Sequence, residues 1–378
     1  MPPRSKSTTA SSSSSSSKVE KKKRSPSSDL SEEEPINSDK EEEEPPKKKK
    51  QKKKEPAVKK GPVTPIHPEL PNNTTLPDPL EPFPKPFNHE KGVLRISSWN
   101  VAGLKACEKK GFSKYVEAED ADILCLNEHK SQQEFKIDSI DSRYPYRYWG
   151  IHHKKGQAGV SIFSKIKPLN VTKGIPPPFS STQEEEVEEG KVRGPSQEES
   201  KGRIITLEFE NNYLIATYVP NAGQGLKNLA EKAAWNKTFE NYLFDLDSKK
   251  PVIWIGDLNV VPTELDIRNW KTNYNKSAGV TDTEIKGFKS QLKGPPPTPE
   301  GGERGFIDVW REKNPNVIGN YSYFSYKFQC RSKGIGWRID FAIVSKRIFE
   351  KVETCEIRQS IYGASDHVPI VIDIQGPL

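Results

Sequence analysis

The sequence of 378 residues has few cysteines and no long apolar run, and each absence excludes a class of protein. The four cysteines (Cys107, Cys125, Cys330 and Cys355) do not have the spacing of zinc ligands, and three of them stand in apolar or strand-like surroundings. Such thiols are typical of reduced intracellular proteins, so neither a zinc site nor a disulfide scaffold is favoured. No segment is long and apolar enough to span a membrane, and the N-terminal residues lack the apolar stretch of a signal peptide.

Apolar residues are also scarce in the first quarter of the chain. Residues 1–92 hold a serine run at 11–17, an acidic cluster at 41–44, a basic cluster at 47–54 and recurrent prolines from 56 to 86. Too few apolar side chains are present to offset the entropy of ordering, so a disordered N-terminal tail is predicted. The basic clusters at 21–24 and 47–54 fit nuclear import signals or a nucleic-acid tether, which predicts a nuclear protein. The alternative is a solvated linker whose charge only aids solubility.

Residues 93–376 have the length of one large domain and alternate between strand-like and helical patterns. One amphipathic helix is predicted around 226–250, with Leu229, Phe239 and Leu243 on its apolar face. This alternation indicates a layered α/β or α+β domain. The predicted strands are 94–101, 123–127, 158–163, 204–209, 213–219, 252–256, 338–344 and 368–374.

The charge balance favours anionic partners to a moderate degree. The tail 1–92 carries 19 basic and 15 acidic side chains, which leaves +3 of the total net charge of +7 for the rest. An acidic insertion at 181–201 holds seven Glu against three basic residues, so the remaining body of the domain carries about +7.

Polar side chains recur where the apolar runs of the predicted strands begin or end. Asp257 and Asn259 follow the run 252–255, and Asp366 and His367 precede the run 368–372. The burial of ionisable groups at strand ends costs free energy unless they bind a metal, an opposite charge or a substrate. The other members of the set are Asn100, Glu128, Tyr218, Asn221 and Asp340.

This mixture of carboxylates, amides, a phenol and an imidazole suits a hard divalent cation that works on a phosphodiester. Mg²⁺ prefers oxygen ligands and keeps several waters, so one or two carboxylates are enough to hold it. Hydrolysis of a phosphodiester needs an activated water, a neutralised phosphate and help for the leaving alkoxide.

Six short segments contain these residues: 98–104 (SWNVAGL), 124–128 (LCLNE), 218–223 (YVPNAG), 256–260 (GDLNV), 337–340 (WRID) and 365–367 (SDH). In their order along the chain, these segments resemble the exonuclease III family, and most closely its eukaryotic apurinic/apyrimidinic endonuclease branch. The resemblance covers about residues 93–376. It implies a four-layered sandwich of two packed β-sheets flanked by helices.

The resemblance also implies an activity and its partners. The expected reaction is Mg²⁺-dependent hydrolysis, with Mn²⁺ as a substitute, of the phosphodiester 5′ to an abasic site, which leaves a 3′-hydroxyl. Side activities as a 3′-phosphodiesterase and 3′–5′ exonuclease are expected as well. The substrate would be double-stranded DNA with abasic sites, and other proteins of base excision repair would be further partners. The protein would act as a monomer and would not bind a membrane.

Residue roles follow from the same resemblance. Glu128 would hold the metal with Asn100 alongside, and Asp366 would contribute directly or through water. Asp257 would be the general acid/base, Asn259 would stabilise the transition state, and His367, oriented by Asp340, would contact the scissile phosphate. The implied metal set is Asn100, Glu128, Asp257, Asn259, Asp366 and His367. The implied DNA contacts are Tyr218 and Asn221 on the phosphate, His367, and Trp337 in the pocket for the extruded sugar.

The sequence departs from this pattern at several positions. Ala102 stands where close relatives carry an acidic or amide residue, which predicts weaker metal binding with catalysis retained. Gln224 replaces an arginine of the DNA groove, Lys327 replaces an apolar wedge, and Tyr323 replaces another pocket aromatic. Ser97 aligns with the redox-active cysteine of animal relatives, so a reducing role is not supported.

Two other functions fit parts of the sequence. One is a phosphodiesterase of the same fold that acts on lipid head groups or RNA ends, which the segment 218–223 and the basic tail disfavour. The other is a catalytically silent DNA-binding protein, which the intact Asp257, Asn259, Asp340 and His367 disfavour.

Overall fold

The structure is a computed structural model that describes residues 76, 80–84, 92–182, 192–296 and 304–378. The chain divides into a unit of residues 1–33 and a unit of residues 34–378, and every described residue belongs to the second. Most of the predicted tail, both of its basic clusters and residues 183–191 of the acidic insertion therefore lie outside the described residues.

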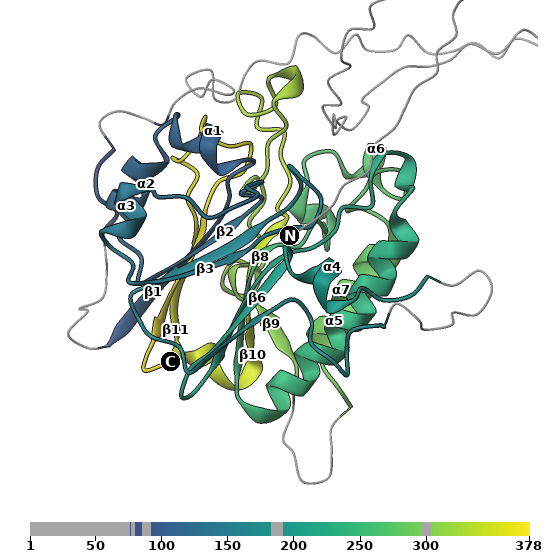
Figure 1. The fold of residues 1–378 in the computed structure, drawn as a ribbon. Helices are drawn as coiled ribbons and strands as arrows, with labels where there is room; N and C mark the ends of the chain where they lie inside the picture. Colours follow the sequence, from purple (N-terminus) through teal and green to yellow (C-terminus); the bar gives the residue numbers. More distant parts are fainter. Residues whose placement is uncertain (1–75, 77–79, 85–91, 183–191, 297–303) are drawn as a thin grey trace, which may run out of the picture. The chain divides into compact units, whose positions relative to one another are not determined.

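Within the described residues, the strands form two six-stranded mixed sheets (Figure 1). In each sheet two central strands run parallel, β1 with β2 and β7 with β8, and the other pairs are antiparallel. The first sheet, in the order β11-β12-β1-β2-β4-β3, contains β11 (Val352–Ile357), β12 (Ile370–Gln375), β1 (Val93–Asn100), β2 (Ile123–Asn127), β4 (Val160–Ser164) and β3 (Tyr146–Gly150). The second, in the order β5-β6-β7-β8-β10-β9, contains β5 (Asn170–Lys173), β6 (Ile204–Glu208), β7 (Tyr213–Tyr218), β8 (Val252–Asp257), β10 (Asp340–Ser345) and β9 (Phe306–Asp308).

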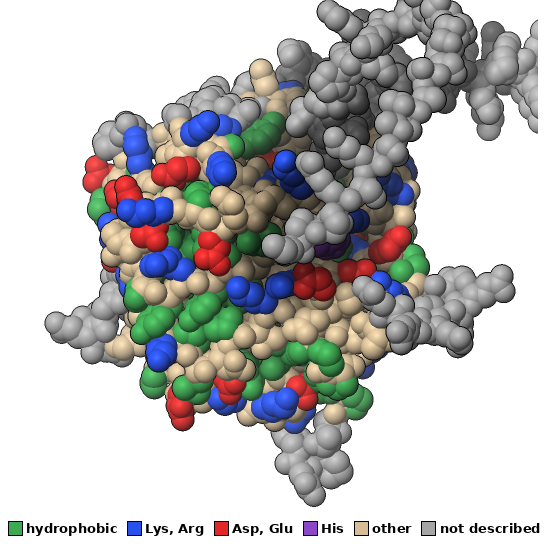
Figure 2. Space-filling view, in the orientation of Figure 1, with side chains coloured by type: hydrophobic (Ala, Val, Ile, Leu, Met, Phe, Trp, Pro, Cys, Tyr) green, Lys and Arg blue, Asp and Glu red, His purple; other side chains and the backbone are tan. Residues whose placement is uncertain are grey.

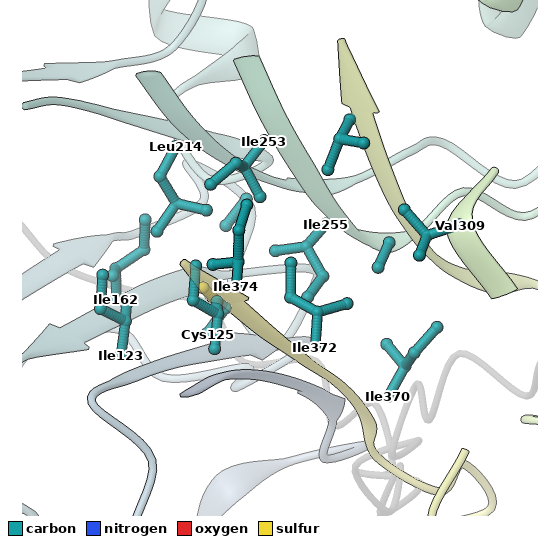
Figure 3. Packing of buried hydrophobic residues seen from close by; sticks show 14 of the residues in the cluster. Ile123, Cys125, Ile162, Leu214, Ile253, Ile255, Val309, Ile370, Ile372 and Ile374 are labelled. Atoms are coloured by element: carbon teal, nitrogen blue, oxygen red, sulfur yellow. The ribbon is translucent and has the colours of Figure 1, made fainter. Parts of the chain in front are cut away.

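The core lies between the two sheets, because successive side chains of a strand point to opposite faces. Ile123 and Cys125 of β2 face Ile253 and Ile255 of β8 across this layer, and Ile372 of β12 packs among them (Figure 3). All five side chains are buried.

Helices cover the outer face of each sheet (Figure 1). The helices α1 (Leu104–Glu108), α2 (Phe112–Glu119) and α3 (Asp138–Asp141) pack on the first sheet around Trp99. The helices α5 (Leu229–Lys249) and α7 (Asp282–Lys293) pack on the second sheet around Trp254. The remaining helical segments are α4 (Gln197–Ser200), α6 (Trp270–Asn273), α8 (Val309–Lys313), η2 (Gln224–Leu226), η3 (Glu264–Asp266), η4 (Lys327–Gln329) and η5 (Lys346–Lys351).

The four-layered sandwich expected from the resemblance is confirmed. Each of the eight predicted strands matches an observed strand, and the predicted amphipathic helix is α5. Four strands were not predicted: β3, β5, β9 and β11. All four lie at sheet edges, and β5 and β9 are short, so a continuous apolar run is missing there.

A short part of the predicted tail lies against the domain. Leu76 is 3% exposed and belongs to the cluster under α1 and α2, where its N–H donates to the carbonyl of Lys110. The N–H of Phe83 donates to the carbonyl of Ala118, and the guanidinium of Arg358 lies over the Phe83 ring. Ordered packing in the described residues therefore begins before residue 93.

On the face drawn in Figure 2, lysine and arginine side chains are interspersed with acidic ones and with small apolar patches. The positive charge is not gathered in a single block on that face. Among the described residues, no helix combines the length and the apolar character needed to cross a membrane.

Candidate active site

The inward-facing side chains of several strands change from apolar to polar at one end of the sandwich. On β8 the series Ile253 and Ile255 ends in Asp257, and on β10 the series Val344 and Ala342 ends in Asp340. Asp257 and Asp340 are register partners, as are Tyr218 and Asp257, and Asn100 and Asn127 are partners in the other sheet. Strand periodicity and register therefore bring these polar groups to one place.

Asp257 lies at the centre of this group and is 1% exposed. Its Oδ2 accepts a hydrogen bond of 2.9 Å from the amide of Asn100, and its Oδ1 accepts one of 2.8 Å from the backbone N–H of Asn259. Gly256 must be glycine here, since a Cβ would lie 2.0 Å from the carbonyl oxygen of Thr217 on the adjacent strand. Burial and the neighbouring Asp340 carboxylate raise the pKa of Asp257 to about 8.

His367 lies between two carboxylates. Its Nδ1 is 2.8 Å from Oδ2 of Asp340, and its Nε2 is 3.9 Å from Oδ2 of Asp257. The hydroxyl of Ser322 accepts from the N–H of Asp340, and the ring of Tyr323 packs on His367 with centroids 4.9 Å apart. Burial alone lowers the pKa of His367, but Asp340 and then Asp257 and Asp366 raise it to about 10.

Glu128 follows β2 and has a left-handed backbone with φ of 51°. Its carboxylate forms an ion pair of 2.8 Å with Lys130 and a hydrogen bond with the hydroxyl of Tyr218. Burial opposes ionisation, but Lys130 and Tyr218 together keep the pKa of Glu128 below its ordinary value. Asp366 lies nearby and is half-buried, and its desolvation and the Glu128 charge raise its pKa.

Asn259 fixes a second polar segment beside Asp257. Its Nδ2 donates to the carbonyl of Val219 at 2.9 Å, and its Oδ1 accepts from Nδ2 of Asn221 at 2.9 Å. The Oδ1 of Asn221 in turn accepts from the N–H of Gly223. The two asparagines therefore tie the segment after β7 to the segment after β8.

Trp337 borders the site on the side of His367. It packs edge-on against Tyr323, with centroids 6.4 Å apart, and belongs to an apolar cluster with Val261, Ile267 and Val280. Trp337 is 6% exposed. The described residues thus place an aromatic wall beside the imidazole.

The donor set of the site fits a hard divalent cation. Ligand atoms of Asp257, Asp340 and His367 all lie within 4.8 Å of one another. Asp340 and Glu128 raise the pKa of Asp257, and Glu128 raises the pKa of Asp366. Lys130 and His367 act in the opposite direction and favour the charged carboxylates. An excess of buried carboxylate oxygens is unfavourable by itself and is relieved by a cation.

All ten residues predicted for the site lie in this one region, although their roles stay predictions. Asn100, Asp257, Asn259 and Asn221 form a continuous chain of hydrogen bonds. The other six contact this chain or its neighbours: Glu128, Tyr218, Asp340, Asp366, His367 and Trp337.

This geometry can be compared with known proteins. Residues 97–367 match the model of the Endonuclease/Exonuclease/phosphatase family. A Dictyostelium discoideum protein named DNA-(apurinic or apyrimidinic site) endonuclease is 38% identical over 290 residues, which are 75% of this chain and 72% of that protein. The chain belongs to the Endonuclease/Exonuclease/phosphatase family. It lies in the exonuclease III branch, and it is a phosphodiester hydrolase.

Other relatives agree with this assignment. A Bacillus subtilis exodeoxyribonuclease is 38% identical over 74% of this chain and 99% of its own length. The DNA repair nuclease APEX1 of Danio rerio is 37% identical over 74% of this chain and 81% of its own. An AP endonuclease structure from Archaeoglobus fulgidus shares the fold, with a TM-score of 0.60, 22% identity and coverage of 75% of this chain and 100% of that one.

Several residues of this exonuclease III site were not predicted from the sequence. Lys130 pairs with Glu128, Asn127 accepts from the N–H of Asp257, and Ser322 holds the backbone of Asp340. Lys232 donates to the backbone carbonyl of Asn259. Only Lys232 left a signal in the sequence, because it is a charged residue on the apolar face of the predicted helix.

Proposed function

We propose that this protein is a DNA-(apurinic or apyrimidinic site) endonuclease that hydrolyses the phosphodiester 5′ to an abasic site and leaves a 3′-hydroxyl. The observation that carries the proposal is the buried set Asp257, His367 and Asp340, with Asn100 and Asn259 bonded to Asp257. A carboxylate with a pKa near neutrality beside a cationic imidazole suits proton transfer at a phosphodiester.

Asp257 would accept the proton of the attacking water. Burial leaves this carboxylate basic enough to act near neutral pH, and the Asn100 amide and the Asn259 N–H fix its two oxygens. The water oxygen bonds to phosphorus as the bond from phosphorus to the upstream 3′-oxygen breaks, and that oxygen takes up a proton to become the 3′-hydroxyl.

His367 would stabilise the charge that develops on the phosphate. Its Nδ1 is held by Asp340, so a protonated ring presents its Nε2–H on the side of Asp257. Asn221, oriented by Asn259, would donate to a phosphate oxygen.

Glu128, Asp366 and Asn100, with Asp257, would hold a divalent cation, and we propose Mg²⁺ with Mn²⁺ as a substitute. When bound, this cation neutralises phosphate charge and lowers the pKa of water. Lys130 now pairs with Glu128, so cation binding requires this lysine to share or release the carboxylate.

Trp337 and Tyr323 would line the pocket for the extruded abasic sugar. An abasic nucleotide has no base to unstack, so its extrusion costs little. Contacts with double-stranded DNA would be mostly to phosphates and therefore sensitive to salt.

The test uses a duplex with one tetrahydrofuran abasic analogue, incubated with Mg²⁺ or with EDTA. We expect a single incision 5′ to the analogue that requires the metal and leaves an end that a DNA polymerase extends. A matched duplex without the analogue should stay uncut in the same time. Tight binding without incision would indicate a silent DNA-binding protein, and hydrolysis of phosphoinositides instead would indicate another phosphodiesterase.

We also propose that the protein acts in base excision repair in the nucleus as a monomer, with 3′-phosphodiesterase and 3′–5′ exonuclease side activities. The support for the nuclear location is the pair of basic clusters at 21–24 and 47–54. Deletion of residues 1–60 should abolish nuclear accumulation of a fluorescent fusion and leave kcat nearly unchanged. Equal nuclear signals from both fusions would contradict the import function.

A further inference from the structure

A buried ion pair lies behind the catalytic strand end. Lys232 of α5 and Glu284 in the first turn of α7 are 2.7 Å apart, and each side chain is only 1% exposed. An apolar pair at such a position is often equally stable or more so, so the burial of two charges is weak evidence for a stabilising role. What the pair adds is a set of directional hydrogen bonds.

These hydrogen bonds reach the segment after β8. Nζ of Lys232 donates to the backbone carbonyl of Asn259. Both carboxylate oxygens of Glu284 accept from the N–H of Gly279, at 2.9 Å and 2.8 Å, and Thr281 donates its hydroxyl to the same carboxylate. The ion pair therefore joins α5, α7 and the segment that carries Asn259.

The backbone at Asn259 needs such support. Its φ is 48°, a left-handed conformation that residues other than glycine adopt at a cost. Such a conformation persists only where its surroundings hold it. The carbonyl of Asn259 is held by Lys232, and its N–H is the group that donates to Oδ1 of Asp257.

Gly279, which Glu284 holds by hydrogen bonds, lies between the Asn259 backbone and Trp337. Its φ is 86°, and a Cβ there would lie 3.1 Å from the carbonyl oxygen of Asn259 and 3.5 Å from Cζ3 of Trp337. The Gly279 carbonyl accepts from the N–H of Val261 at 2.8 Å. Glu284 thus fixes a residue that leaves no free space for a side chain between the Asn259 backbone and Trp337.

We infer that Lys232 and Glu284 are positioning residues that hold Asn259, and through it Asp257, in the geometry needed for hydrolysis. This inference rests on the proposed function. Without the ion pair, the backbone N–H of Asn259 moves away from Oδ1 of Asp257 and their hydrogen bond weakens. The chemical step is therefore slower. Substrate binding, carried mainly by contacts to phosphates, changes little.

The test compares Lys232→Met, which removes the charge and the donor, with the double variant Lys232→Met/Glu284→Leu, which replaces the pair by apolar side chains. We expect kcat to fall about 10- to 100-fold in both, with KM within about twofold of the wild type. The double variant should recover much of the lost Tm, because no unpaired buried charge remains, but it should not recover kcat.

The matched control is Asp373→Asn, which breaks the buried ion pair between Arg95 and Asp373 in the other sheet. This variant should lose Tm without loss of kcat at a temperature where all variants are folded. Wild-type kcat in both Lys232 variants, or recovery of kcat together with Tm in the double variant, would overturn the inference. A wild-type protein that leaves the abasic duplex uncut would instead refute the proposed function.

Discussion

The carboxylate of Asp340 lies 2.8 Å from Nδ1 of His367 and leaves Nε2 of the same ring 3.9 Å from Asp257. Asp340 begins β10, and His367 stands just before β12 in the other sheet. The contact therefore joins the two sheets at the open end of their shared core. It fixes both the ring orientation and the atom that carries the available proton.

Substitution of Asp340 tests this relationship. In Asp340→Asn the charge that raises the pKa of His367 is lost, so the imidazole is less often protonated and less well oriented. We expect kcat on the abasic duplex to fall by roughly 10³-fold, together with a lower pKa of His367 in an NMR titration. Asp373→Asn serves as the control for loss of a buried carboxylate elsewhere. An unchanged kcat would remove Asp340 from its assigned role.

Asp257 is the proposed acceptor of the proton of water. Asp257→Asn keeps the size of the side chain and its hydrogen bond from the Asn259 N–H but cannot take up that proton. Turnover should be abolished while binding of the abasic duplex, measured by fluorescence anisotropy in EDTA, persists within a few fold. A fully active Asp257→Asn protein would rule out this assignment.

A carboxylate in place of Ala102 should raise the affinity of the site for Mg²⁺. Ala102 has φ of 48°, a conformation that aspartate tolerates better than alanine, and its N–H donates to Oδ1 of Asn100. In Ala102→Asp we expect half-maximal activity at a several-fold lower Mg²⁺ concentration, with kcat at saturating Mg²⁺ nearly unchanged. Ala102→Ser, which adds no charge, is the control. The same Mg²⁺ requirement in the wild type and in Ala102→Asp would show that no carboxylate is missing at this position.

Protonation of His152 should lower the free energy of unfolding in acid. Burial, together with Arg203 and His153, lowers the pKa of His152 to about 4, so the folded protein favours the neutral ring. The stability from this group is fully present above the unfolded pKa of about 6.5 and is lost as the pH falls towards 4. At pH 5 the loss amounts to about 2 kcal/mol relative to pH 7.5.

His152→Asn checks this prediction, since the new carbonyl oxygen can accept the Lys154 N–H that Nδ1 accepts now. Urea unfolding at pH 7.5 and pH 5 should show a smaller acid loss in the variant than in the wild type. Equal losses in the two proteins would mean that His152 is not the group responsible.

Much of the site could be predicted from the sequence because its residues stand at the ends of continuous apolar runs, such as those of β2 and β8. Asp257 continues the inward face of β8, so the strand and the polar residue at its end are visible together. The edge strands β5 and β9 are short and lack continuous apolar runs, and these were missed. The contact of Leu76 with the domain was missed for a similar reason, because it is an isolated apolar residue in a proline-rich stretch.

The sequence by itself determined the eight strands that carry apolar runs and the polar residues that stand at their ends. Only the tertiary structure decided that Asp340 pairs with His367, that Lys130 pairs with Glu128, and that Lys232 reaches the carbonyl of Asn259. An apolar run is a local pattern, since it involves only neighbouring residues of one strand. Pairing across two sheets depends on register and packing between segments far apart in the chain, and no local pattern encodes these distances.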